Sequence, residues 1–108
     1  MKIVIQIGDL VNRADIEHLF TVLPKNTQSL VDTFVVYASN DPEAHYQYYS
    51  PNKTFGFHSP KNSAVTKSEA ISGIATHLLA TTDFGYLPDT ISQSKMQQYL
   101  ATWQDLCS

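Results

Sequence analysis

The sequence predicts a small α+β fold in a single domain spanning residues 1–108, and three observations support this class. A length of 108 residues corresponds to one domain. Runs of β-branched and aromatic residues alternate with segments of helical apolar spacing. No linker, repeat or low-complexity segment divides the chain. The predicted order is β-α-β-β-β-α-α, a small sandwich with the helices packed on one face of the sheet.

The first half of the chain predicts a strand, a helix and a second strand. Residues 2–7 are rich in β-branched side chains and end at Gly8, which predicts a buried strand at a central position in the sheet. Asn12 is expected to cap a helix that Pro24 ends. Residues 30–38 predict the second strand, closed by turn-forming residues.

Residues 44–59 predict an antiparallel β-hairpin with arms at 45–49 and 54–58. Pro51 cannot adopt the positive φ of a tight primed turn, so the connecting loop must be longer than two residues. A loop centred on Pro51 and Asn52 fixes the register of the two arms. The expected cross-strand pairs are Tyr48 with Phe55, Tyr46 with Phe57, and His45 with His58.

The second half of the chain predicts two helices. Thr66 and Glu69 have capping-box spacing, and apolar residues recur at helical spacing through about residue 81. Gly73 weakens this helix by roughly 1 kcal/mol relative to Ala and indicates close packing. Ser92 is expected to cap a last helix. The inner face of that helix carries Met96, Tyr99, Leu100, Trp103 and Leu106. Three apolar residues in the segment between the two helices are expected to be buried against the rest of the domain: Phe84, Tyr86 and Leu87.

Charge is unevenly distributed along a chain whose net charge is −3. Residues 44–68 hold five aromatics, three lysines and two histidines without an acidic residue, whereas the segments on both sides are acidic. The negative net charge argues against wrapping of duplex nucleic acid, which needs dense phosphate neutralisation. The local basic and aromatic segment indicates instead a surface for contact with a partner.

Targeting and redox features predict a cytoplasmic protein that does not enter a membrane. The first residues lack the apolar length of a signal peptide, and no stretch reaches the roughly 18 apolar residues of a membrane helix. Cys107 is the only cysteine, so an internal disulfide is excluded and a reducing compartment is expected.

No catalytic constellation or cofactor motif is present, so neither a catalytic residue, a cofactor nor a metal is expected. His45 and His58 would face one another as two zinc or nickel ligands, but Glu43 is the nearest carboxylate in sequence and a metal needs three or four ligands. Asp15 and His18 have the i, i+3 spacing of a base and its orienting group. No nucleophile is placed beside them.

Residues 53–57, Lys-Thr-Phe-Gly-Phe, are similar to the K-G-F-G-F core of the RNA recognition motif. The resemblance implies strand aromatics that stack on unpaired bases. The order of the first elements also agrees with that family. The first strand lacks the family's stacking aromatic and no fourth strand is predicted after the second helix, so the chain is not assigned to this family.

The aromatic composition of the hairpin predicts that the chain is an interaction protein. We expect a small acidic, non-enzymatic protein that binds a protein or nucleoprotein complex and inhibits or regulates it, as immunity proteins and phage-encoded inhibitors do. Tyr and Phe with few charges are typical of interface cores. The expected partner-binding residues are His45, Tyr46, Tyr48, Tyr49, Lys53, Phe55, Phe57 and His58. Because side chains alternate along a strand, about half of these are expected to belong to the core.

Other functions follow from the same residues. Asp15 and Glu17 are expected to add an acidic face toward a basic partner. One alternative is a single-stranded RNA or DNA binder that uses the aromatics for stacking and three lysines for phosphates: Lys53, Lys61 and Lys67. A further alternative is a small enzyme built on Asp15 and His18 or on the histidine pair. The hairpin aromatics would equally suit a homodimer seam.

Overall fold

The computed structural model of the chain describes residues 1–7, 9–61 and 63–108. Its elements are β1 (Lys2–Ile5), α1 (Arg13–Val22), α2 (Lys25–Gln28), β2 (Thr33–Ala38), β3 (His45–Tyr49), the 3-10 helix η1 (Ser50–Asn52), β4 (Thr54–Ser59), α3 (Lys67–Phe84) and α4 (Gln93–Cys107). The predicted α+β class and element order are confirmed. The single turn α2, which follows directly after Pro24, was not predicted.

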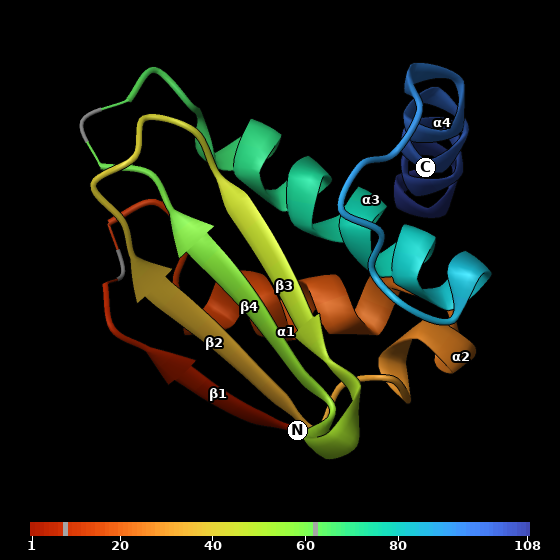
Figure 1. The fold of residues 1–108 in the computed structure, drawn as a ribbon, viewed down its shortest axis with the longest axis horizontal. Helices are drawn as coiled ribbons and strands as arrows, with labels where there is room; N and C mark the ends of the chain where they lie inside the picture. The colour runs from red at the N-terminus through yellow and green to blue at the C-terminus, as the bar shows by residue number, and fades with distance from the viewer. Residues whose placement is uncertain (8, 62) are drawn as a thin grey trace.

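The four strands form one mixed sheet in the order β1-β2-β4-β3 (Figure 1). β1 pairs with β2 and β2 with β4 in parallel, and β3 pairs with β4 in antiparallel fashion at the outer edge. The prediction of a central first strand is wrong, because β1 forms the opposite edge. Only Ile3 of this strand is fully buried, and the Arg13 guanidinium donates a 2.8 Å hydrogen bond to the outward Ile3 carbonyl.

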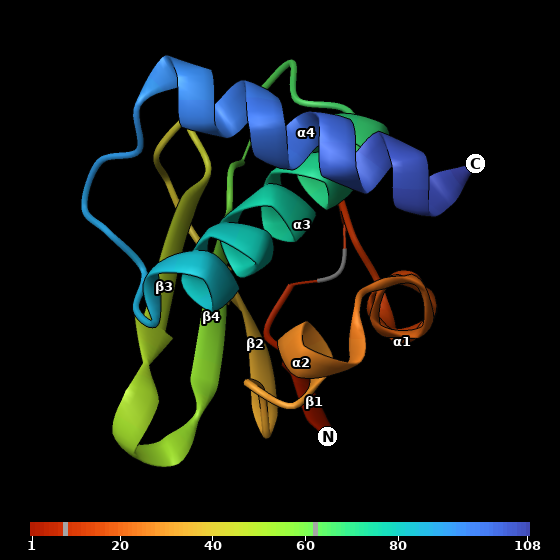
Figure 2. The same ribbon diagram turned by 90° about the vertical axis from the view of Figure 1, so that its right-hand side faces the viewer.

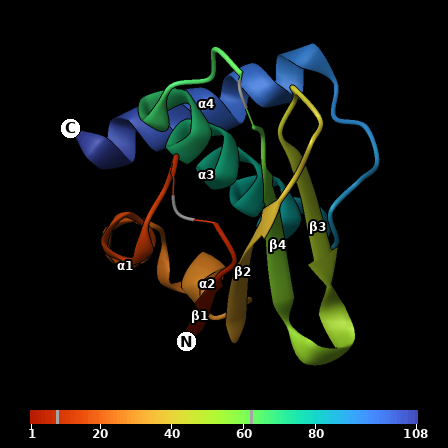
Figure 3. The same ribbon diagram turned by 90° about the vertical axis from the view of Figure 1, so that its left-hand side faces the viewer.

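The helices lie on one face of the sheet. α1 and α3 pack against it, and α4 packs on α3 as an outer layer (Figures 2 and 3). In the described part of the chain no helix covers the other face, which we call the open face. No helix in these residues is long and apolar enough to cross a membrane.

The core lies between the sheet and the two inner helices. Phe34 of β2 and Phe55 of β4 are fully buried and stacked, with ring centroids 5.6 Å apart. Phe20 of α1 meets Phe34 edge-on at 5.9 Å. Ile74 and Leu78 of α3 complete this layer and have no exposed surface. The aromatic stack across β2 and β4 therefore fixes how the hairpin attaches to the rest of the sheet.

Local capping signals set where the helices begin and end. All three predicted N-caps are confirmed: Asn12, Thr66 and Ser92 each accept a hydrogen bond from the N–H of the third helical residue. At Asn12 and Thr66 the side chain of that residue also accepts a hydrogen bond from the backbone N–H of the cap. α3 runs past residue 81 to Gly85, whose φ of 80° is a left-handed conformation that favours glycine.

The connection between α3 and α4 does not pack as predicted. Phe84 and Tyr86 remain 40% and 59% exposed, so the expectation that they pack under the domain is wrong. Only Leu87 is half-buried. The Gly85 turn directs the chain outward, away from the helix layer, and the connection then runs outside β3 (Figure 2).

Gly73 on α3 allows the close packing that the sequence predicted. A Cβ at this position would overlap the Tyr46 hydroxyl, and the Tyr46 ring is stacked on His77 with centroids 3.7 Å apart. We expect Gly73→Ala to destabilise the protein by about 1–3 kcal/mol despite its better helix propensity. Urea denaturation of the wild type and the variant measures the difference in the free energy of unfolding. In a Tyr46→Phe background the penalty should shrink, and an unchanged penalty would contradict the clash.

Candidate functional site

The predicted hairpin is present. β3 and β4 pair in the predicted register: Tyr48 with Phe55, Tyr46 with Phe57, and His45 with His58. Ser50–Asn52 form the η1 turn, and Lys53 then adopts a positive φ of 52° with its N–H bonded to the Ser50 carbonyl. The turn is thus the longer loop that Pro51 requires.

Strand alternation divides the predicted contact residues between two faces. Four face the helices, namely Tyr46, Tyr48, Phe55 and Phe57. Three lie on the open face, namely His45, Tyr49 and His58. Phe55 and Phe57 are core residues with no exposed surface, so the expectation that they contact a partner is wrong. Tyr49 is 61% exposed and is the most accessible aromatic of the hairpin.

The open face carries an aromatic pair that the sequence did not indicate. The Tyr37 ring of β2 lies over Gly56 of β4, where an added Cβ would come within 2.8 Å of the ring. Tyr37 is also stacked on His58, with ring centroids 4.7 Å apart. The His58 Nε2 atom is buried and has no hydrogen-bond partner in the described residues. The sequence held one signal for this position: because side chains alternate along β2, Tyr37 is expected on the face opposite the buried Phe34.

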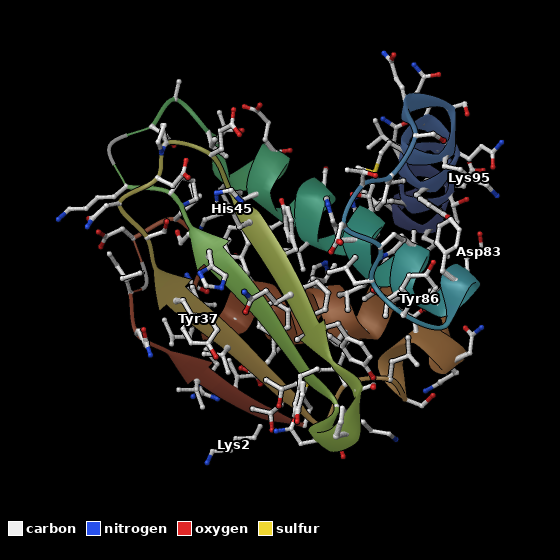
Figure 4. The ribbon with its side chains drawn as sticks, in the orientation of Figure 1. Lys2, Tyr37, His45, Asp83, Tyr86 and Lys95 are labelled. Atoms are coloured by element: carbon white, nitrogen blue, oxygen red, sulfur yellow. The ribbon has the colours of Figure 1, made fainter. Side chains whose placement is uncertain are left out.

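His45 lies at the start of β3, beside a carboxylate. Its Nε2 atom is 2.9 Å from the Asp41 carboxylate, and both side chains are about half exposed. The Glu43 backbone N–H and then His45 lower the pKa of Asp41. Figure 4 shows His45 and Tyr37 on the sheet, well apart from Asp83, Tyr86 and Lys95 at the junction of α3 and α4.

Tyr46 and Tyr48 anchor the outer edge strand to the helix side. Tyr46 stacks on His77, whose Nδ1 lies 2.7 Å from the Gly73 carbonyl. Burial lowers the pKa of His77, so its ring is neutral near pH 7 and donates from Nδ1 to that carbonyl. The Tyr48 hydroxyl donates to the Leu30 carbonyl at 2.6 Å. β3 is therefore held firmly although it is the last strand of the sheet.

A groove runs along the outer edge of β3. It consists of two cavities of about 440 and 380 Å³, which share Tyr46 on one side and Leu87, Pro88 and Asp89 on the other. The first cavity reaches the exposed end of the strand at Tyr49. Asp89 is the only carboxylate that lines either cavity, and in the described residues it makes no ion pair.

The candidate acidic face lies elsewhere. Asp15 and Glu17 belong to α1, at the side of the molecule away from β3 (Figures 2 and 3). Burial raises the pKa of Asp15, but the Asn12 backbone N–H and the Lys67 ammonium at 3.1 Å outweigh burial and lower it. No hydrogen bond joins Asp15 to His18 within the described residues. Asp15 serves as a capping residue and an ion-pair partner.

Two of the three lysines proposed for phosphate contact, Lys53 and Lys67, are engaged with other segments of the chain. The Lys53 ammonium donates to the Ser29 carbonyl at 3.2 Å, and Lys67 is paired with Asp15 at the start of α3. No group of three or more His, Cys, Asp or Glu side chains in the described residues is arranged to hold a metal ion. Asp41, rather than the expected Glu43, is the carboxylate that meets His45.

No family model, curated protein or solved structure matches this chain. Function is therefore inferred from the geometry of its own residues.

The raised tyrosine pKa values predict how stability changes in alkaline solution. Burial raises the pKa of Tyr46 to about 12, and burial together with the Asp83 carboxylate raises that of Tyr99 to about 12. Unfolded tyrosines ionise near pH 10. The stabilising effect of these two groups is therefore complete below pH 10 and is lost as the pH rises toward 12.

Phenolate absorbance during an alkaline titration measures these pKa values. Tyr46 and Tyr99 should ionise last among the six tyrosines. Tyr99→Phe should remove one late-ionising group, while Tyr86→Phe, at an exposed site, should remove an early one. Simultaneous ionisation of all six tyrosines while the fold is intact would contradict this expectation.

Proposed function

We propose that the protein is a non-enzymatic binding protein whose partner is another protein, and that it engages this partner through the edge of the sheet formed by the hairpin. Binding occludes a surface of the partner and thereby inhibits or regulates it. The observation that carries the proposal is the outer strand β3, an aromatic strand without an acidic or lysine residue that borders a groove.

Composition and exposure along β3 support a protein partner. Interfaces between proteins are enriched in Tyr and depleted in Lys and acidic residues at their centre. β3 has the sequence His-Tyr-Gln-Tyr-Tyr, and Tyr49 is 61% exposed at its end. Tyr37 and His58 extend the same surface across the open face. Asp41, Lys53 and Asp89 lie around it as a polar rim.

The geometry gives less support to single-stranded nucleic acid. Base stacking needs exposed aromatic faces along a positively charged groove. Phe55 and Phe57 are fully buried, and among the described residues that line the groove Asp89 is the one Asp, Glu, Lys or Arg, so the groove carries no positive charge from lysine or arginine. Lys53 and Lys67 are engaged in separate contacts at different ends of the molecule.

Affinity capture tests the proposal. The tagged protein is used to capture ligands from a lysate of the cells that encode it, with and without nuclease. We expect a nuclease-resistant protein that is lost with a His45→Ala, Tyr49→Ala double variant, whose substitutions lie at exposed positions of β3. Asp105→Asn on α4 is the matched surface control at an exposed position and should retain it. Nuclease-sensitive recovery of RNA or DNA would overturn the proposal in favour of nucleic-acid binding.

A further inference from the structure

The two edges of the sheet differ in how their backbone groups are used. At the β1 edge, the Arg13 guanidinium bonds the outward carbonyl of Ile3. At the β3 edge, no backbone hydrogen bond leads outward from the strand to any other described segment. An edge strand with unpaired N–H and C=O groups is a template for another strand unless charge, proline, a bulge or a covering segment blocks it. Inside β3 there is no Lys, Asp, Glu or Pro.

The hydrogen-bond pattern identifies which groups of β3 point outward. The Thr33 N–H donates to the Lys53 carbonyl, so residue 53 and, by alternation, residues 55 and 57 direct their backbone groups toward β2. Gly56 then bonds toward β3, where its partner is Gln47. Consequently the N–H and C=O groups of Tyr46 and Tyr48 point away from the sheet, into the groove.

The α3–α4 connection does not close directly onto β3, because the two cavities of about 440 and 380 Å³ lie between them, and an added strand would occupy this groove. Neighbouring strands lie about 4.7–4.9 Å apart. Residues 87–89 stand on the far side of the groove from Tyr46, and the α3–α4 connection that carries them runs outside β3 in every view (Figures 1–3). In an antiparallel β3–β3 dimer related by a two-fold axis, the two copies of this connection would lie on the same side of the joint sheet and meet at the seam. A single extended segment avoids this crowding.

Side chains around the groove indicate the chemistry of that segment. On the helix side the groove is lined by Ile91 and Met96 together with the Tyr46 and His77 rings, a mixed surface that offers apolar contacts to alternate side chains of an added strand. Asp89 lines both cavities and is the only carboxylate among the described residues that line them. An acidic group in this position is complementary to a Lys or Arg side chain.

We propose that β3 accepts an extended segment of a partner protein as a fifth strand, bonded to the backbone of Tyr46 and Tyr48, with a Lys or Arg of that segment paired to Asp89. This mode of binding rests on the proposed function and specifies its site and the chemistry of its ligand.

Peptide selection supplies the probe for a test. A library of random dodecapeptides displayed on phage is selected on the full-length protein, and the best binder is synthesised. We expect apolar residues at alternate positions and at least one Lys or Arg. Asp89→Asn should weaken binding about tenfold, equivalent to roughly 1.4 kcal/mol. Asp105→Asn, an exposed carboxylate on α4, is the control and should leave it unchanged. Equal loss in both variants, or in neither, would overturn the pairing with Asp89.

Amide hydrogen exchange by NMR identifies the strand itself. Saturating peptide should slow exchange at the Tyr46 and Tyr48 amides by at least about tenfold, because these groups gain hydrogen bonds. The Gln47 amide, already bonded to β4, should change little. N-methylation of one alternate set of peptide residues should abolish binding while the other set tolerates it.

Other outcomes separate this proposal from the proposed function. A peptide that binds without slowing exchange at Tyr46 and Tyr48, or a library without binders, would overturn strand addition. Capture of a protein partner through His45 and Tyr49 would still support the proposed function in that case. A dimer in solution that dissociates as peptide binds would assign the edge to a second copy of the chain and overturn the proposal.

Discussion

Phe55→Ala should destabilise the protein by about 3–5 kcal/mol, which is the usual cost of truncating a buried phenylalanine. The Phe55 side chain has no exposed surface, and it packs between Phe34 at 5.6 Å and Tyr48 at 6.5 Å, measured between ring centroids. Its loss would leave a cavity where β4 joins β2 to the hairpin. Since domains of this size are stable by about 5–15 kcal/mol, a large fraction of the protein should be unfolded at modest urea concentration.

Urea denaturation followed by circular dichroism measures this effect. Tyr49→Ala provides a matched control on the same hairpin, because Tyr49 is 61% exposed and its loss should change the free energy of unfolding by about 0.5 kcal/mol or less. If Phe55→Ala had as small an effect as Tyr49→Ala, Phe55 would not be the core residue that the structure shows.

Trp103→Ala should have an effect of similar size, again about 3–5 kcal/mol. Trp103 is the only tryptophan and lies on the buried side of α4 with 7% exposure. It borders a cavity that Leu19 and Val22 of α1 and Ile71 of α3 also line, so it joins α4 to two other helices. Tyr99 adds one further link to α3 through a 2.6 Å hydrogen bond to Asp83.

Far-UV circular dichroism and thermal unfolding measure the loss of α4 packing. Leu100→Ala on the same helix is the control, since Leu100 lies on the side of α4 that faces Gly73 and Thr76 of α3 but remains 38% exposed. It should cost much less than Trp103→Ala. Equal costs for the two substitutions would contradict the orientation of α4 in the structure.

The hairpin and the helix ends could be predicted because their signals are local. Pro51 restricts the turn, and the turn length sets the pairing of His45 with His58. Asn12 and Thr66 reach backbone groups only three residues away. Such short-range bonds depend on residues that are neighbours in the sequence, so the pattern contains the necessary information.

The positions of β1 and of the groove could not be predicted, because they depend on contacts between distant segments. An apolar β-branched run has the same pattern at an edge as at the centre of a sheet, and it is the Arg13 side chain that bonds to the outer side of β1. Asp89 reaches the groove through the outward turn at Gly85. The exposure of Phe84 and Tyr86 could not be predicted for the same reason, since the apolar character of these residues alone indicated burial.

The mixed pairing of the sheet has a consequence for the order in which the protein folds. β3 and β4 are joined by one short turn, and such hairpins close within microseconds. β1 must wait until α1 and α2 have bridged it to β2, because parallel strands require a long crossover. Substitutions in the hairpin should therefore slow refolding, whereas substitutions in β1 should mainly accelerate unfolding. The surface proposed to bind a partner would then be among the first parts of the chain to take shape.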